Sequence, residues 1–182
     1  ELELARPEDS PARQGYRMPP EWAPHEATWL SWPHNRDTWP GCFDGVEPAM
    51  ADAAAALAEV EHVYINVLGA EHEAHVRRLL ASRVPPERVR YFYIPTNDAW
   101  VRDHGPIFVT REGPAPRLAL DFGYNAWGGK YLPYDLDQAA AAKTGHGAAH
   151  GFLRGADHGG DVLLRQRRLN QDAVGRRFTH PL

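Results

Sequence analysis

The sequence contains a single cysteine, Cys42, and therefore cannot form an internal disulfide. No apolar stretch approaches the ~20 residues that span a bilayer, and the N-terminus lacks the pattern of a secretion signal. A net charge of −4 gives no electrostatic reason to bind nucleic acid or an anionic membrane. We therefore expect a cytoplasmic protein with neither nucleic acid nor a membrane among its partners.

The remaining composition is that of an ordinary globular protein, with 43% hydrophobic and 24% charged residues among 182. The chain has no initiator methionine, so we expect a trimmed or internal piece. Tryptophan is the more informative residue type, because aromatic side chains in polar loops often line pockets for flat or cationic ligands; core packing is the competing use. Five of the six tryptophans precede position 101: Trp22, Trp29, Trp32, Trp39 and Trp100.

Alternating hydrophobic patterns predict an α/β fold with short connections. The spacing of Asp44 and Glu47 is that of a capping box, which predicts a helix start near Val46. Predicted strands cover residues 27–33, 63–68, 89–94, 107–110 and 117–122. Predicted helices cover residues 46–59, 71–82 and 133–143.

Periodicity fades after about residue 145. We therefore divide the chain into an extended lead-in (1–17), an α/β domain (18–145) and a divergent tail (146–182). We expect the tail to be either disordered or the product of a frameshift, and we assign no packed element to it.

The loop after the third predicted strand, residues 95–106, concentrates charged and aromatic side chains. Asp98, Trp100, Arg102, Asp103 and His104 lie within seven positions. Two interpretations remain open on these residues alone. One is a pocket for a flat cation, and the other is a salt-bridged turn, since aspartate and asparagine favour turns.

Three long motifs in order resemble the agmatine deiminases of the bacterial-type (Porphyromonas-type) peptidyl-arginine deiminase family. They are residues 18–33 (MPPEWAPHEATWLSWP), 97–106 (NDAWVRDHGP) and 121–131 (DFGYNAWGGKY). The resemblance covers roughly residues 16–143. It implies a pentein fold, in which ββαβ-type units form a cyclic α/β propeller around a substrate channel, here incomplete.

The resemblance also implies hydrolysis of a guanidinium group, for example agmatine to N-carbamoylputrescine and ammonia in putrescine and polyamine biosynthesis. The family uses no metal and no organic cofactor. By resemblance, Asp103 grips the substrate guanidinium and Trp100 packs along it. The chemistry agrees, because a guanidinium stays protonated and its planar fork pairs best with carboxylates.

The other candidate site residues have competing interpretations. Asp98 and Arg102 either contact the substrate or brace the loop, and bracing is favoured. Trp127 either walls the channel or supports the glycine turn. Trp32 is a further substrate-binding candidate. His104 follows Asp103 in a strand-like segment, where neighbouring side chains point opposite ways, so we expect it to be supporting or exposed.

The family's remaining machinery is missing from the sequence: a Glu-Gly-Gly segment, a His-x-Asp segment and a glycine-rich segment ending in the nucleophilic cysteine. Cys42 with His34 or His104 as base is one substitute, and a small buried or loop residue without a catalytic role is the favoured alternative. His146, His150 and His158 form only a weak metal-binding pattern. We therefore expect no turnover from this chain alone. The alternatives are a non-catalytic guanidinium or polyamine binder and one part of a split enzyme, with self-association or a complementary chain as partner.

Overall fold

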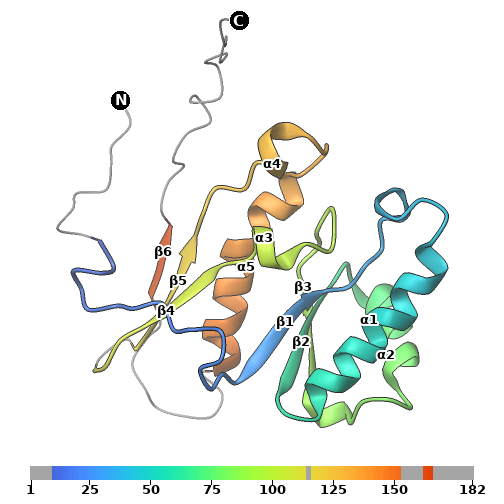
Figure 1. The fold of residues 1–182 in the computed structure, drawn as a ribbon, viewed down its shortest axis with the longest axis horizontal. Coiled ribbons are helices and arrows are strands. Elements are labelled where there is room, and N and C mark those ends of the chain that lie inside the picture. The colour runs from blue at the N-terminus through green and yellow to red at the C-terminus, as the bar shows by residue number, and fades with distance from the viewer. Residues whose placement is uncertain (1–9, 114–115, 153–161, 166–182) are drawn as a thin grey trace, which may run out of the picture.

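The computed structural model describes residues 10–113, 116–152 and 162–165, and it has a mixed α/β fold. The chain forms two separate three-stranded sheets, and helices cover one face of each (Figure 1). Each predicted strand is present, with ends that differ by at most two residues. Within the described ranges, no helix is both long and apolar enough to cross a membrane.

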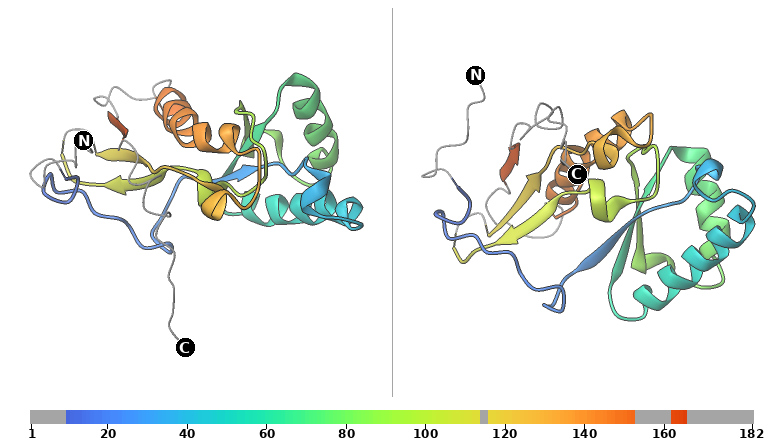
Figure 2. Two further views of the ribbon diagram at one scale, coloured as in Figure 1. Left: turned by 90° about the horizontal axis from the view of Figure 1, so that it is seen from above. Right: turned by 45° about the horizontal axis from the view of Figure 1, so that its top comes forward.

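The first sheet is fully parallel, in the order β1-β2-β3. The central strand β2 is buried on both faces along nearly its whole length, which explains its continuous apolar sequence. Helices α1 and α2 cover one face, as two further views confirm (Figure 2). The elements are β1 (Ala27–Ser31), α1 (Phe43–Ala58), β2 (His62–Val67), α2 (Ala70–Leu80) and β3 (Val89–Tyr93).

Helix α1 differs from its prediction at the N-terminal end. It begins at Phe43, and its N-cap Cys42 makes no side-chain capping hydrogen bond, so the predicted capping box is wrong. Asp44 instead pairs with Arg36 at 2.9 Å. The buried Phe43 side chain explains the earlier start, because packing rather than a polar cap holds the first turn.

The second sheet has the order β4-β5-β6, with β4 antiparallel and β6 parallel to β5. Helix α5 covers one face of it and also contacts the short helix α3 (Figure 2). The elements are α3 (Val101–His104), β4 (Ile107–Thr110), β5 (Arg117–Asp121), α4 (Ala126–Gly129), α5 (Asp135–Phe152) and β6 (Val162–Arg165).

The C-terminal segment contains more regular structure than the sequence predicted. Helix α5 continues to Phe152, and β6 pairs with β5 so that Leu118 lies opposite Val162. The sequence allowed no assignment after residue 145, and the structure describes these two regular stretches there. The physical reason is tertiary: the short apolar run 162–164 is stabilised by pairing with a strand edge more than forty residues earlier. Residues 153–161 and 166–182 lie outside the described part.

The lead-in is tied to the second sheet. Tyr16 is buried beside Val109 and Leu118, and Arg17 forms an antiparallel bridge with Thr110. The expected extended segment 1–17 is therefore docked at its C-terminal end, because an apolar ring and two backbone hydrogen bonds attach it to β4. Residues 1–9 lie outside the described ranges.

Candidate functional site

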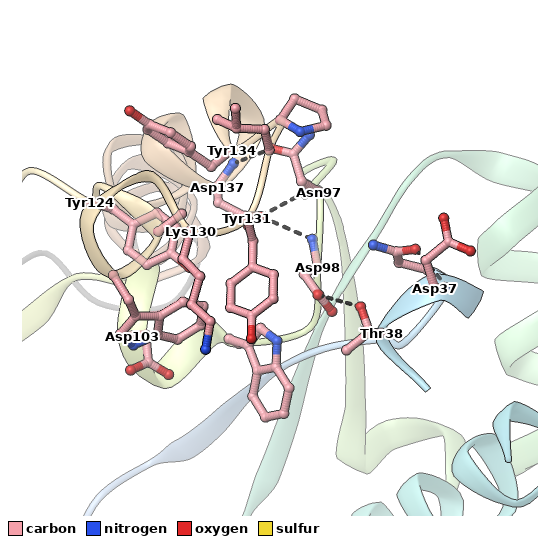
Figure 3. Close-up of a pocket in the computed structure, with 16 residues that line it drawn as sticks. Asp37, Thr38, Asn97, Asp98, Asp103, Tyr124, Lys130, Tyr131, Tyr134 and Asp137 are labelled. Atoms are coloured by element: carbon pink, nitrogen blue, oxygen red, sulfur yellow. Dashed lines mark hydrogen bonds between the residues drawn. The ribbon is translucent and has the colours of Figure 1, made fainter. Parts of the chain in front are cut away.

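A pocket of about 960 Å³ lies beside the loop that follows β3. That size is in the range of small-molecule sites. Three segments line it: the 3-10 turn η2 (Arg36–Thr38) with Asn35, the loop and helix from Asn97 to Asp103, and the segment from Tyr124 to Asp137. Figure 3 shows Thr38 and Asp103 on opposite sides in that view, with Asp98 between them.

Helix α3 sets the direction of the site residues. The Trp100 carbonyl accepts hydrogen bonds from the backbone N–H groups of Asp103 and His104, at 2.9 and 3.1 Å. In a helical turn these neighbours do not point opposite ways, as they would in the strand-like segment that the sequence suggested. Asp103 is exposed to the pocket and His104 is 2% exposed. The strand-like interpretation is therefore wrong, and His104 is a buried supporting residue rather than an exposed one.

Carboxylates dominate the charge of the pocket. Asp37, Asp98, Asp103 and Asp137 line it, against a single described basic side chain, Lys130. The Lys130 ammonium lies 5.0 Å from the centre of the Tyr131 ring. Among the described residues, the Asp103 carboxylate forms no hydrogen bond or ion pair. In the described part of the structure the Asp37 carboxylate likewise forms no hydrogen bond or ion pair, and an acidic pocket with two uncommitted carboxylates is suited to a cation.

Asp98 braces the loop. One of its oxygens accepts the Ala99 backbone N–H at 2.7 Å, and the other accepts the Thr38 hydroxyl at 2.5 Å. Arg102 points away from the pocket, where its guanidinium pairs with Glu21, and its side chain is 82% exposed. The bracing interpretation of both residues fits this geometry, and the structure gives no support to a substrate contact by Arg102.

Aromatic rings form the pocket walls on both sides. Trp100 packs against Trp39, with ring centres 5.8 Å apart, and Trp127 meets Tyr124 edge-on at 5.7 Å. Both Trp100 and Trp127 line the pocket. Flat rings beside carboxylates can pack against the face of a planar cation.

The turn that carries Trp127 has an unusual backbone. Ala126 and Trp127 adopt φ values of 50° and 55°, and Gly128 and Gly129 continue the left-handed path. Asn125 stabilises the turn by accepting the Gly128 backbone N–H at 3.0 Å. A non-glycine pair at positive φ is strained, and such strain persists where surrounding contacts over-determine it. Trp127 therefore lines the pocket from within this turn, and both roles suggested by the sequence stay predictions.

Trp32 is not a pocket residue. Its side chain is 1% exposed within the core formed by the first sheet and its helices, and its indole N–H donates to Glu47 at 2.8 Å. The expectation that Trp32 binds substrate is not supported, because packing and a satisfied buried donor account for this ring.

Tyr124 lies close enough to three acids of the site for their charges to affect its pKa. Burial, followed by the charges of Asp137, Asp103 and Asp98, raises the pKa of Tyr124 to about 12. Its hydroxyl group therefore remains protonated at neutral pH and can donate a hydrogen bond into the acidic pocket.

Residues 17–157 match the family described as Porphyromonas-type peptidyl-arginine deiminase. The chain belongs to this family. The match extends beyond residue 143, where the motif resemblance ended.

Several members of the deiminase family are similar in sequence. An agmatine deiminase of Pseudomonas aeruginosa (strain LESB58) is 35% identical over 144 residues, which cover 77% of the chain and 38% of that protein. A relative from Yersinia pestis is 30% identical over 174 residues, which cover 93% of the chain and 44% of the relative. The chain thus spans about two-fifths of the length of the curated relatives it matches.

Solved structures of the family share the fold. An agmatine deiminase of Enterococcus faecalis has a TM-score of 0.66 and 33% identity, over 76% of the chain and 37% of that structure. A C. jejuni agmatine deiminase, described as having substrate bound, has a TM-score of 0.59 and 27% identity, over 70% of the chain and 35% of that structure.

Cys42 does not line the pocket. The residue is exposed and caps α1. His34 packs edge-on against His72 at 5.9 Å, and His104 is buried. Within the described residues, neither imidazole forms a hydrogen bond with the Cys42 thiol, and whether Cys42 can act as a nucleophile stays a prediction.

The described residues contain no group of three or more side chains that could hold a metal ion. The side chains of His146, His150 and His158 lie outside the described part of the structure.

The sequence did not identify several of the residues that line the pocket of this deiminase-family chain. Tyr124 and Lys130 lie inside the third motif, whose aromatic and glycine-rich composition was their only signal. No sequence motif marked Asp37, Thr38 or Asp137 as site residues, because each reaches the pocket only through tertiary packing.

Proposed function

We propose that this chain is the guanidinium-binding part of an agmatine deiminase-type hydrolase. The complete reaction would convert agmatine and water to N-carbamoylputrescine and ammonia, a step of putrescine and polyamine biosynthesis. The single observation that carries the proposal is that the Trp100 ring and an Asp103 carboxylate without a hydrogen-bond partner among the described residues line the same acidic pocket.

The chemistry of a guanidinium explains the assignment of roles. The group stays protonated, and its planar fork donates two parallel hydrogen bonds to one carboxylate. Asp103 would receive these bonds, while Trp100 and Trp127 would pack against the substrate. The pocket carboxylates would also keep positive charge on the central carbon, which makes that carbon a better target for a nucleophile.

Turnover would need groups that this pocket does not contain. A cysteine thiolate attacks and a histidine shuttles protons in the resembled family, and no cofactor takes part. We propose that further units supply these groups and close a propeller around the channel. The two sheets described here are open, so their edge strands could pair with such units or with another copy of the chain.

A non-catalytic binder is the second candidate. The observation in its favour is that Cys42, the one cysteine in the sequence, lies outside the pocket. A binder would hold a guanidinium or a polyamine without ammonia release. A split enzyme would release ammonia only after a complementary chain is added.

Isothermal titration calorimetry with agmatine tests the proposal on the purified chain. We expect binding by the unchanged chain and a loss of about tenfold or more in affinity for Asp103→Asn, since a charge-assisted pair is removed. Asp44→Asn is the matched control, because it removes the same charge from an exposed side chain outside the pocket. Equal losses in the two variants, or no heat from the unchanged chain, would contradict the proposal.

An ammonia assay tests the expectation that turnover needs further units. The chain alone should release no ammonia from agmatine. Ammonia release that disappears in Asp103→Ala would overturn the expectation that turnover needs further units.

A further inference from the structure

Asp137 and Asn97 form a reciprocal clamp beneath the pocket. One carboxylate oxygen of Asp137 accepts the backbone N–H groups of Asn97 and Asp98, at 2.7 and 3.2 Å. The Asn97 side-chain oxygen accepts the backbone N–H groups of Leu136 and Asp137, at 2.8 and 3.1 Å. These four hydrogen bonds join the site loop to the first turn of α5. Figure 3 draws Asn97, Asp98 and Asp137 with the hydrogen bonds between them.

The clamp has a clear physical cause. The first N–H groups of a helix have no partner within the helix and need an acceptor from elsewhere. In α5 the acceptor comes from Asn97, about forty residues earlier in the chain, rather than from a neighbouring capping residue. Asp137 is 3% exposed, so its carboxylate could not leave the loop N–H groups without losing buried hydrogen bonds.

His104 connects the clamp to the helix that carries Asp103. Its Nε2 lies 3.7 Å from the bonded oxygen of Asp137, and the imidazole packs edge-on against Tyr124 at 5.8 Å. Burial lowers the pKa of His104 and raises the pKa of Asp137, while each partner opposes the shift of the other. The two side chains thus form one buried polar unit between α3 and α5.

We propose that Asp137 is a positioning residue of the cation site. Its carboxylate holds the backbone of Asn97 and Asp98 and, through its contact with His104, the turn that presents Asp103. This inference rests on the proposed function, because the ligand whose affinity it controls is the guanidinium.

Asp137 lines the same pocket as Asp103 but differs from it in burial and in hydrogen bonding. Both loop N–H groups converge on the same oxygen, and the carboxylate is almost completely enclosed. Binding sites lose affinity when the residues that support them allow small displacements. A displaced Asn97–Asp98 backbone would also disturb the Thr38–Asp98 hydrogen bond at the opposite wall.

Three variants of the full chain test the inference. Asp137→Ala removes the acceptor, Asp137→Asn keeps an oxygen acceptor without the charge, and Asp135→Asn is the control. Asp135 lies in the same first turn but outside the pocket lining, and it accepts a long 3.5 Å hydrogen bond from Asn97. Agmatine affinity is measured by calorimetry, and exchange of the Asn97 and Asp98 amide hydrogens is measured by NMR.

We expect Asp137→Ala to weaken agmatine binding by about tenfold or more and to accelerate exchange of both amides. Asp137→Asn should recover most of the affinity and the protection, and Asp135→Asn should match the unchanged chain. β2 amides should stay protected in every variant, which shows that the first sheet is folded. Asn97→Ala, which removes the reciprocal half of the clamp, should weaken binding in the same direction as Asp137→Ala.

Two results would overturn the inference. One is unchanged affinity or unchanged amide exchange in Asp137→Ala. The other is an Asp137→Asn variant that keeps its protected amides but binds as weakly as Asp137→Ala, because the charge rather than the position would then matter. If the unchanged chain binds no agmatine, the proposed function fails by itself, and amide exchange still decides whether Asp137 holds the loop.

Discussion

Thr38 donates its hydroxyl hydrogen to the Asp98 carboxylate at 2.5 Å, although 60 positions separate the two residues. The hydrogen bond joins the 3-10 turn η2 after β1 to the site loop after β3. Both segments follow the carboxyl ends of parallel strands, which meet at one edge of a sheet. The relationship explains why Asp98 serves as a brace, whereas Asp103 faces the pocket.

Removing this hydrogen bond should loosen the pocket. We expect Thr38→Val to lower the free energy of unfolding by about 1–3 kcal/mol, because a part-buried hydrogen bond to a carboxylate is lost. Agmatine affinity should fall several-fold as well. Urea denaturation and calorimetry measure the two effects. Thr38→Ser keeps the hydroxyl and should remain close to the unchanged chain; a Ser variant as weak as the Val variant would contradict the assignment, because serine keeps the donor.

Gly105 ends α3 in a crowded position. Its φ of −77° would suit any residue, but an added Cβ would lie well inside van der Waals contact of the Val101 carbonyl oxygen. We expect Gly105→Ala to destabilise the fold by about 1–3 kcal/mol, since the turn carrying Asp103 must shift. Urea denaturation measures the change in stability, and calorimetry measures the accompanying loss of agmatine affinity.

Gly45 provides the matched control for that substitution. It lies in α1, where an added Cβ meets nothing within 4 Å. Gly45→Ala should therefore stabilise the chain by about 0.5–1 kcal/mol, because glycine is a poor helix former. If both alanine variants destabilise equally, steric crowding at Gly105 is not the cause.

His72 should make folding sensitive to acid. Burial, followed by the charges of His34 and His75, lowers the pKa of His72, and Glu47 opposes the shift. Its Nδ1 also accepts the Leu68 backbone N–H at 3.1 Å. The folded pKa lies below the unfolded value of about 6.5, so the stability contribution is complete above that pH and is lost as the pH falls below it. Urea denaturation at several pH values between about 7.5 and 5 should show that acidification lowers the free energy of unfolding less in His72→Asn than in the unchanged chain.

His25 has a pKa shift of the opposite sign. A hydrogen bond with the Ala23 carbonyl raises its pKa despite some burial, and Glu61 adds to the rise. The contribution of His25 to folding stability is therefore present at low pH and is lost as the pH rises through its pKa in the folded state. Urea denaturation over the same pH range should show a larger loss of stability on acidification in His25→Gln. Identical pH profiles for the two histidine variants would contradict both assignments.

Local patterns predicted the regular elements well where one face or a continuous run was apolar. The strands at 63–68 and 107–110 are examples, because β-branched and aromatic residues bounded by turns leave few alternatives. The start of α1 was mispredicted because the Asp44–Glu47 spacing fits a capping box that burial of Phe43 overrides. Strand β6 was missed because a four-residue strand depends on its partner rather than on its own sequence.

For the site, the sequence by itself determined the composition of the loop, the likeness of its motifs to a deiminase family and the choice of Asp103 and Trp100. These are properties of neighbouring residues, which a linear chain displays directly. Tertiary structure alone decided that Trp32 belongs to the core, that Arg102 points outward and that Thr38, Tyr124 and Asp137 complete the pocket. Those roles depend on contacts between segments distant in sequence, and each contact forms only when the sheets and helices bury their apolar faces together.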